Sequence, residues 1–172
     1  MSKLRPSPWR FVSSEGADLS ASIFVGVKGS FYVQNDSDPD QIVHELMYAG
    51  MGFQAGKGLP VGGSFSTADF MNLHLGRIYY GPRNFYGIST DDFGGAGIIV
   101  SVAASLLGTN LLGNASGGNV SLVVWSLPFG FFRDPRKIIA GECYALGLIS
   151  GTSTATPGVG VSACPVVFSV DP

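Results

Sequence analysis

The chain has 172 residues, a length typical of one domain with a hydrophobic core of its own. Charged residues make up only 13% of it, about half the usual share of roughly 25%. Ten basic and twelve acidic residues leave a formal net charge of −2, so the chain as a whole lacks the basic surface that nucleic-acid binding requires. We therefore expect no nucleic-acid partner.

The first part of the chain predicts a hairpin and then one helix. Residues 21–27 and 30–34 have the pattern of two strands joined by a turn. Asp38 is a favourable N-cap residue, and Pro39 suits the first helical position, which predicts one short helix near 39–50. The apolar stripe of this helix would consist of Ile42, Val43, Leu46, Met47 and Ala49, and Gly50 would end it.

The middle of the chain alternates between turns and short aromatic segments. Residues 50–66 are rich in glycine and proline, which predicts a loop or a bulged strand. Residues 77–80 and 84–88 predict two short aromatic strands, and the pair Asp91-Asp92 predicts a turn.

Charged residues are absent from two long windows, residues 93–132 and 143–170. Charged side chains are almost never fully buried unless they are paired. A window without them is therefore expected to be enclosed by the protein's own core, by a partner subunit or by lipid. The sequence leaves these three alternatives open.

Both windows predict β-strands, which decides the expected fold class. Residues 98–106 and 120–127 are strand candidates in the first window, and residues 143–149 and 159–170 are candidates in the second. Many short strands without an internal repeat are typical of an all-β domain. We expect a mainly β, single domain over residues 1–172, an antiparallel sandwich or barrel with one short helix near 39–50.

One alternative for the first window is a hairpin that inserts into a membrane. Residues 97–127 would form this hairpin, because its second strand nearly reaches the roughly 9–11 residues of a spanning strand. Aromatic residues and then cations follow directly, a mix typical of bilayer interfaces. The ordinary interpretation is a strand end and a solvated turn. The candidate ligand or membrane contacts are Trp125, Phe129, Phe131, Phe132, Arg133, Arg136 and Lys137.

Histidine and cysteine are the main candidates for catalysis. His74 lies between apolar neighbours and is interpreted as a half-buried strand residue, with a functional histidine as the alternative. Cys143 and Cys164 are interpreted as buried free thiols, with a disulfide between them as the alternative. Either thiol could pair with His74 as nucleophile and base in a small hydrolase, although nothing in the spacing favours such a pair.

No metal or cofactor motif is complete. The acidic residues of segment 36–40 alternate like calcium ligands, but Gln41 and Met47 stand where a calcium loop requires glycine and glutamate, so helix capping explains the acids better. The glycine-rich segment 56–58 lacks the ending of a phosphate-binding loop. We expect no cofactor and no metal.

These observations favour a non-enzymatic binding or assembly module that uses an apolar, glycine-rich sheet surface. Its expected partners are a second copy of the chain or an apolar ligand. The alternatives are a membrane-active protein, such as a secreted effector or pore-former, and a small hydrolase. The N-terminal segment is polar, without the apolar stretch of a secretory signal, so the default expectation is the cytoplasm, with export by a route without a cleaved signal as the alternative.

Overall fold

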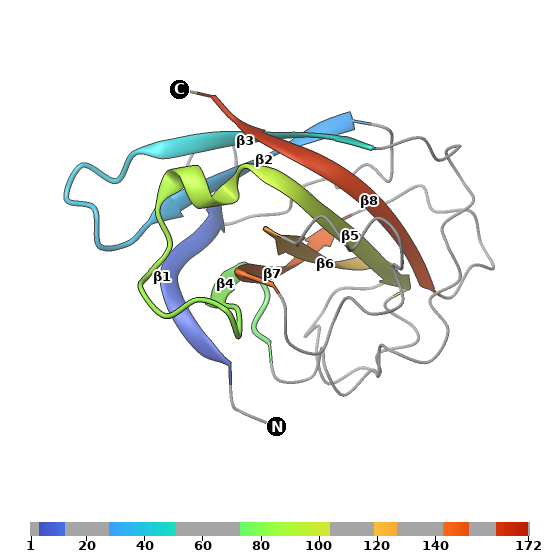
Figure 1. The fold of residues 1–172 in the computed structure, drawn as a ribbon, viewed down its shortest axis with the longest axis horizontal. Coiled ribbons are helices and arrows are strands. Elements are labelled where there is room, and N and C mark those ends of the chain that lie inside the picture. Colours follow the sequence, from blue (N-terminus) through green and yellow to red (C-terminus); the bar gives the residue numbers. More distant parts are fainter. Residues whose placement is uncertain are drawn as a thin grey trace.

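The computed structural model describes residues 4–12, 28–50, 73–103, 119–126, 143–151 and 161–171. Its eight strands close into an antiparallel barrel with the strand order β1-β2-β3-β8-β5-β6-β7-β4 (Figure 1). The mainly β prediction is confirmed, and of the two expected architectures the structure has the barrel, because β4 pairs with β1 and closes the sheet. The elements are β1 (Arg5–Val12), β2 (Lys28–Asn35), β3 (Val43–Gly50), β4 (Arg77–Tyr80), the 3-10 helix η1 (Thr90–Phe93), β5 (Gly95–Ala103), β6 (Asn119–Trp125), β7 (Ala145–Gly151) and β8 (Val161–Val170).

The predicted helix near 39–50 is wrong, because residues 43–50 form strand β3. Leu46 lies opposite Phe31 on β2 and opposite Val170 on β8, so both sides of β3 are paired. The acidic residues that were expected to cap a helix form the turn between β2 and β3 instead. There, the Asp38 carboxylate accepts a hydrogen bond of 3.0 Å from the backbone N–H of Asp40.

Strand β1 was not predicted, because Pro6 and Pro8 interrupt its sequence and neither can donate a backbone hydrogen bond. The side chain of Ser7 supplies the missing contacts to the neighbouring strand. Its hydroxyl donates to the carbonyl of Ile78 on β4 at 2.7 Å and accepts from the backbone N–H of Trp9 at 3.2 Å. The buried Ser7 hydroxyl thus bridges β1 and β4 where the proline residues break the ladder.

Aromatic rings fill the interior of the barrel. The rings of Phe31 and Tyr48 stack with their centroids 4.9 Å apart, and those of Phe93 and Trp125 meet edge to face at 5.1 Å. An eight-stranded barrel is just wide enough for side chains to fill it. The buried core consists of Trp9, Phe11, Phe31, Val33, Leu46, Tyr48, Ile78, Phe93, Ile99, Val123, Trp125, Ala145, Ile149, Val166 and Phe168.

Glycine residues make room for these rings. A Cβ atom on Gly97 would collide with the ring of Phe168 and with the carbonyl oxygen of Val124. A Cβ atom on Gly147 would lie 2.6 Å from a ring carbon of Phe11, far closer than carbon atoms approach. Part of the high glycine content therefore has a packing role inside the barrel.

The wall formed by β5, β6 and β7 is buried on both of its faces at residues 97–99, 121–125 and 145–149. Ile99 and Val123 belong to the interior core, whereas Ile98, Leu122 and Val124 alternate with them and are nevertheless buried. The outward side chains of β7, Leu146 and Leu148, are buried as well, and Leu75 bridges to Leu148 beside that strand. Burial on both faces explains why these three segments of the charge-free windows carry no charge.

Candidate binding surfaces

The predicted contact residues can be compared with the structure at one position. Trp125 is 0% exposed and packs against Phe11, Phe93 and Phe168 at centroid distances of 5.8, 5.1 and 5.7 Å. Its side chain is part of the core and offers no surface to a ligand or a lipid in this structure. The other six residues of that set, Phe129, Phe131, Phe132, Arg133, Arg136 and Lys137, lie outside the described residues.

His74 lies on the surface in the segment before β4, so the expectation that it is a half-buried strand residue is wrong. Its backbone N–H donates to the hydroxyl of Tyr79 at 2.8 Å, and its carbonyl accepts from the N–H of Arg77 at 3.2 Å. These are backbone contacts of a turn. A functional role for the imidazole stays a prediction.

Cys143 is buried and is a free thiol, in agreement with the expectation for this residue. Burial raises the pKa of the Cys143 thiol to about 11, a rise that a backbone hydrogen bond partly opposes. The thiolate is the nucleophilic form of cysteine. Because the thiol of Cys143 stays protonated near neutral pH, it is poorly suited to the nucleophilic role in the hydrolase alternative.

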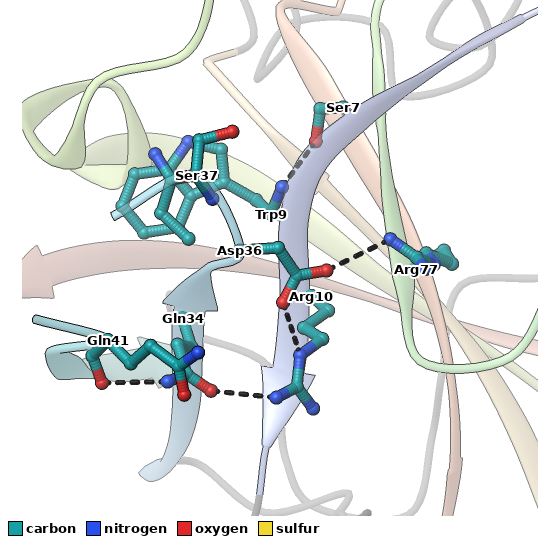
Figure 2. Close-up of polar contacts among 9 residues, drawn as sticks. Ser7, Trp9, Arg10, Gln34, Asp36, Ser37, Gln41 and Arg77 are labelled. Carbon is teal, nitrogen blue, oxygen red and sulfur yellow. Dashed lines mark hydrogen bonds and ion pairs between the residues drawn. The ribbon is translucent and has the colours of Figure 1, made fainter. Parts of the chain in front are cut away.

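A polar cluster at the turn between β2 and β3 joins residues that the sequence did not associate (Figure 2). The Asp36 carboxylate contacts the guanidinium of Arg10 at 2.6 Å and that of Arg77 at 3.2 Å, and so connects this turn to β1 and β4. Gln34 accepts from Arg10 at 2.9 Å and donates to the carbonyl of Gln41 at 2.7 Å. The ion pairs are partly exposed, where such pairs contribute at most about 1 kcal/mol each. We interpret this cluster as structural, because it joins the turn between β2 and β3 to β1 and β4, the two strands whose pairing closes the barrel.

Groups of three or more His, Cys, Asp or Glu side chains that could hold a metal ion do not occur among the residues that the structure describes. Within the same ranges, none of the helical structure is long and apolar enough to span a membrane.

The first candidate binding surface is the outer face of β3 and β8, defined by Val43, Met47 and Ala49 of β3 and Val167 and Ser169 of β8. Met47 and Val167 are each 42% exposed, which is high for large apolar side chains. Ala49 lies directly opposite Val167, and Met47 lies opposite Ser169, so Met47, Ala49 and Val167 form one apolar strip across the two strands. Glu45 lies on the same face of β3, between Val43 and Met47. The nearest acid on β3, Glu45, accepts a hydrogen bond from the hydroxyl of Tyr32 at 3.4 Å.

The second candidate surface is the aromatic loop, residues 81–89, which connects β4 to η1 beside β1 (Figure 1). Phe85 is 77% exposed and Tyr86 is 97% exposed, so two adjacent rings project into solvent at the tip of this loop. The sequence predicted a strand at 84–88, and this prediction is wrong. An exposed pair of rings could not be distinguished from a half-buried strand by composition alone.

Asn84 holds the aromatic loop in its shape. Its buried side-chain carbonyl accepts hydrogen bonds from the backbone N–H groups of Tyr86 at 3.1 Å and Gly87 at 2.9 Å. The indole N–H of Trp9 donates to the carbonyl of Ile88 at 2.8 Å and ties the end of the loop to β1. Asn84 thus satisfies backbone groups that a strand would pair with a neighbour, which favours a turn here.

Two arginine residues lie at the base of the aromatic loop. Arg5 donates to the carbonyl of Asn84 at 3.3 Å, and its guanidinium lies 5.1 Å from the ring centroid of Tyr80. Arg83 is within the loop and is exposed. The sequence from Arg77 to Thr90 contains no acidic residue. The loop therefore combines exposed rings with arginine residues at its start, while the Asp92 carboxylate contacts its other end at Ser89.

Comparison with family models, with curated proteins and with solved structures finds no significant match, so similarity to another protein assigns no function to this chain.

Proposed function

We propose that this protein is a non-enzymatic binding or assembly module, and that it associates with a second copy of itself through the outer face of β3 and β8. The observation that carries the proposal is the apolar strip of Met47, Ala49 and Val167, which remains exposed, whereas the outward side chains of β5 to β7 whose burial is described, such as Ile98, Leu122 and Leu148, are buried. Monomeric proteins usually cover large apolar side chains or scatter them singly.

The closed barrel limits how two copies could associate. A barrel without free strand edges cannot extend its sheet by adding a strand from a neighbour. Association must then occur through side chains on an outer face. The outer face of β3 and β8 is suited to this role because its exposed members are apolar or small and form a strip that can pack against its own copy about a two-fold axis.

A second copy fits this surface better than a small apolar ligand. Small-molecule sites are concave and enclose most of their ligand. The outside of a barrel is convex, and the interior of this barrel is filled by its own aromatic side chains. An apolar strip on a convex wall therefore favours a flat contact between proteins.

Analytical ultracentrifugation over a micromolar concentration series tests the proposal. We expect the wild-type chain to form a concentration-dependent dimer, and we expect Met47→Asp and Val167→Asp to remain monomeric with unchanged circular dichroism. Tyr86→Asp is the matched control, since it places the same charge at an exposed ring on the other candidate surface. A wild-type chain that stays monomeric, or a dimer that Met47→Asp does not weaken, would overturn the proposal.

A further inference from the structure

We propose that the aromatic loop, residues 81–89, is a membrane anchor that attaches the barrel reversibly to an anionic lipid surface. Phe85 and Tyr86 would enter the interface between headgroups and acyl chains, and Arg5 and Arg83 would lie at the level of the lipid phosphates. The proposal concerns a different surface from the one assigned to self-association. Strand β4, which leads into the loop, lies across the barrel from β3 and β8 in the strand order.

The exposure of the two rings is the first argument. Phe85 and Tyr86 are the most exposed of the large apolar side chains in the described residues, at 77% and 97%. Aromatic side chains with one polar end favour the membrane interface, where the ring leaves water and the hydroxyl remains hydrated. The pairing of Phe with Tyr at a loop tip is suited to shallow insertion.

The fixed conformation of the loop is the second argument. The tip is held by the two hydrogen bonds to the buried Asn84 carbonyl, and the loop end is held by the bond from Trp9 to Ile88. A binding element that is already ordered loses less conformational entropy when it binds. The rings can therefore enter an interface without a costly rearrangement of the loop backbone.

The two arginine residues beside the rings favour an anionic surface. Arg5 and Arg83 lie at the loop, and the first acidic residues after it along the chain are Asp91 and Asp92 on η1. The Asp92 carboxylate accepts hydrogen bonds from the N–H and the hydroxyl of Ser89 at 2.7 and 2.8 Å. Lipid phosphates and serine headgroups would complement the two cations.

The same residues fit nucleic acid less well. Single-stranded nucleic acids also stack on aromatic rings, but their affinity depends on several phosphate contacts along a basic groove. Two arginine residues on a chain of net charge −2 supply too few such contacts. Membrane attachment depends mainly on the rings, which this loop presents fully.

Vesicle flotation of the full chain tests the anchor, with phosphatidylcholine vesicles that contain or lack phosphatidylserine. We expect the wild-type chain to float with the anionic vesicles. We expect Phe85→Ser with Tyr86→Ser to lower the partition coefficient by at least about tenfold, because two rings no longer leave water. Arg83→Gln should weaken binding to the anionic vesicles by roughly fivefold and leave binding to neutral vesicles unchanged.

Three further variants make the test specific. Tyr86→Phe retains the ring and should retain binding. Met47→Ser alters the outer face of β3 and β8 and should still float, so that failure of the self-association proposal can be distinguished from failure of this one. Tyr86→Trp places a reporter at the tip, and its fluorescence should shift to the blue with anionic vesicles, because the native Trp9 and Trp125 are buried.

The proposal is overturned if the wild-type chain does not float with anionic vesicles. It is also overturned if the double serine variant, shown to be folded by its melting temperature, floats as the wild type does. If the wild-type chain does not bind vesicles but binds a protein through Phe85 and Tyr86, the loop is a site for a protein partner and the membrane proposal is overturned.

Discussion

Gly147 on β7 lies against the ring of Phe11 on β1, with the position of a Cβ atom on Gly147 only 2.6 Å from the ring carbon Cε2. The two strands are not neighbours in the sheet, because β4 lies between them. The contact therefore passes over β4 on the interior side of the barrel. The ring of Phe11 in turn packs against Phe31 and Trp125, each at a centroid distance of 5.8 Å. The absence of a side chain at Gly147 thus sets the position of the central aromatic cluster.

Gly147→Ala is expected to lower the free energy of unfolding by about 1–3 kcal/mol, because an added methyl group in a filled core forces its neighbours to move. Urea denaturation measures the change. The double variant Gly147→Ala with Phe11→Leu should lose less than the sum of the two single variants, because the smaller side chain relieves the collision. Strict additivity of the two losses would show that the Gly147–Phe11 contact does not control this packing.

Ser7→Ala is expected to destabilise the barrel by about 1–3 kcal/mol, because the carbonyl of Ile78 and the N–H of Trp9 lose a buried partner. Thermal and urea denaturation both report this loss. Ser30→Ala on β2 is the matched control, since Ser30 is exposed and should change stability by less than about 0.5 kcal/mol. Equal stability of the two variants would contradict the bridging role of Ser7.

Asn84→Ala is expected to loosen the aromatic loop. Its side-chain carbonyl accepts from the N–H groups of Tyr86 and Gly87, so amide hydrogen exchange at these two positions should accelerate at least about tenfold. Exchange in β6, on a different part of the barrel, should change far less. Unchanged exchange at Tyr86 and Gly87 would mean that the loop is held by its other contacts, such as the one from Trp9 to Ile88.

The buried thiol of Cys143 is expected to make the free energy of unfolding depend on pH at alkaline pH. Burial raises the pKa of its thiol from the ordinary value of 9.0 to about 11 in the folded state. Between these two pH values the unfolded chain loses the proton first and binds fewer protons than the folded chain. This thiol therefore lowers the free energy of unfolding as pH rises through that window, by up to about 1.4 kcal/mol per pH unit.

The comparison of Cys143→Ala with the wild type isolates this contribution, because other groups that titrate at alkaline pH are common to both chains. Urea denaturation from pH 8 to pH 11 should show that the stability of the wild type falls more steeply than that of the variant. Parallel pH profiles would show that the thiol ionises equally in the folded and unfolded chains.

The sequence was sufficient to predict strands where the local residue pattern agrees with the environment of the segment in the folded protein. The strand over residues 77–80 coincides with β4, and the strands expected in the charge-free windows correspond to β5, β6, β7 and β8. In these segments β-branched and aromatic residues, low charge and turn residues at the ends all favour the same structure. The apolar pattern also indicated burial, which the structure confirms for residues 97–99, 121–125 and 145–149, whereas Val167 in the second window is exposed.

The tertiary structure overruled local signals in three segments. Residues 43–50 have a spacing that suits a helix, but pairing with β2 and β8 makes them a strand. Strand β1 tolerates its prolines because the hydroxyl of Ser7, on the same strand, reaches across to the carbonyl of Ile78. The aromatic segment 84–88 is a loop because Asn84 satisfies its backbone N–H groups.

The amino-acid sequence by itself determined that this protein is mainly β, and it indicated the burial that the structure shows for residues 97–99, 121–125 and 145–149. Amino-acid composition and the period of apolar residues decide such properties, because these properties depend on which side chains can leave water. Only the tertiary structure decided that the sheet closes into a barrel, that Trp125 belongs to the core, and that Met47, Val167, Phe85 and Tyr86 remain exposed. Exposure depends on which strands become neighbours, and that pairing joins residues too far apart in the chain for any local pattern to specify.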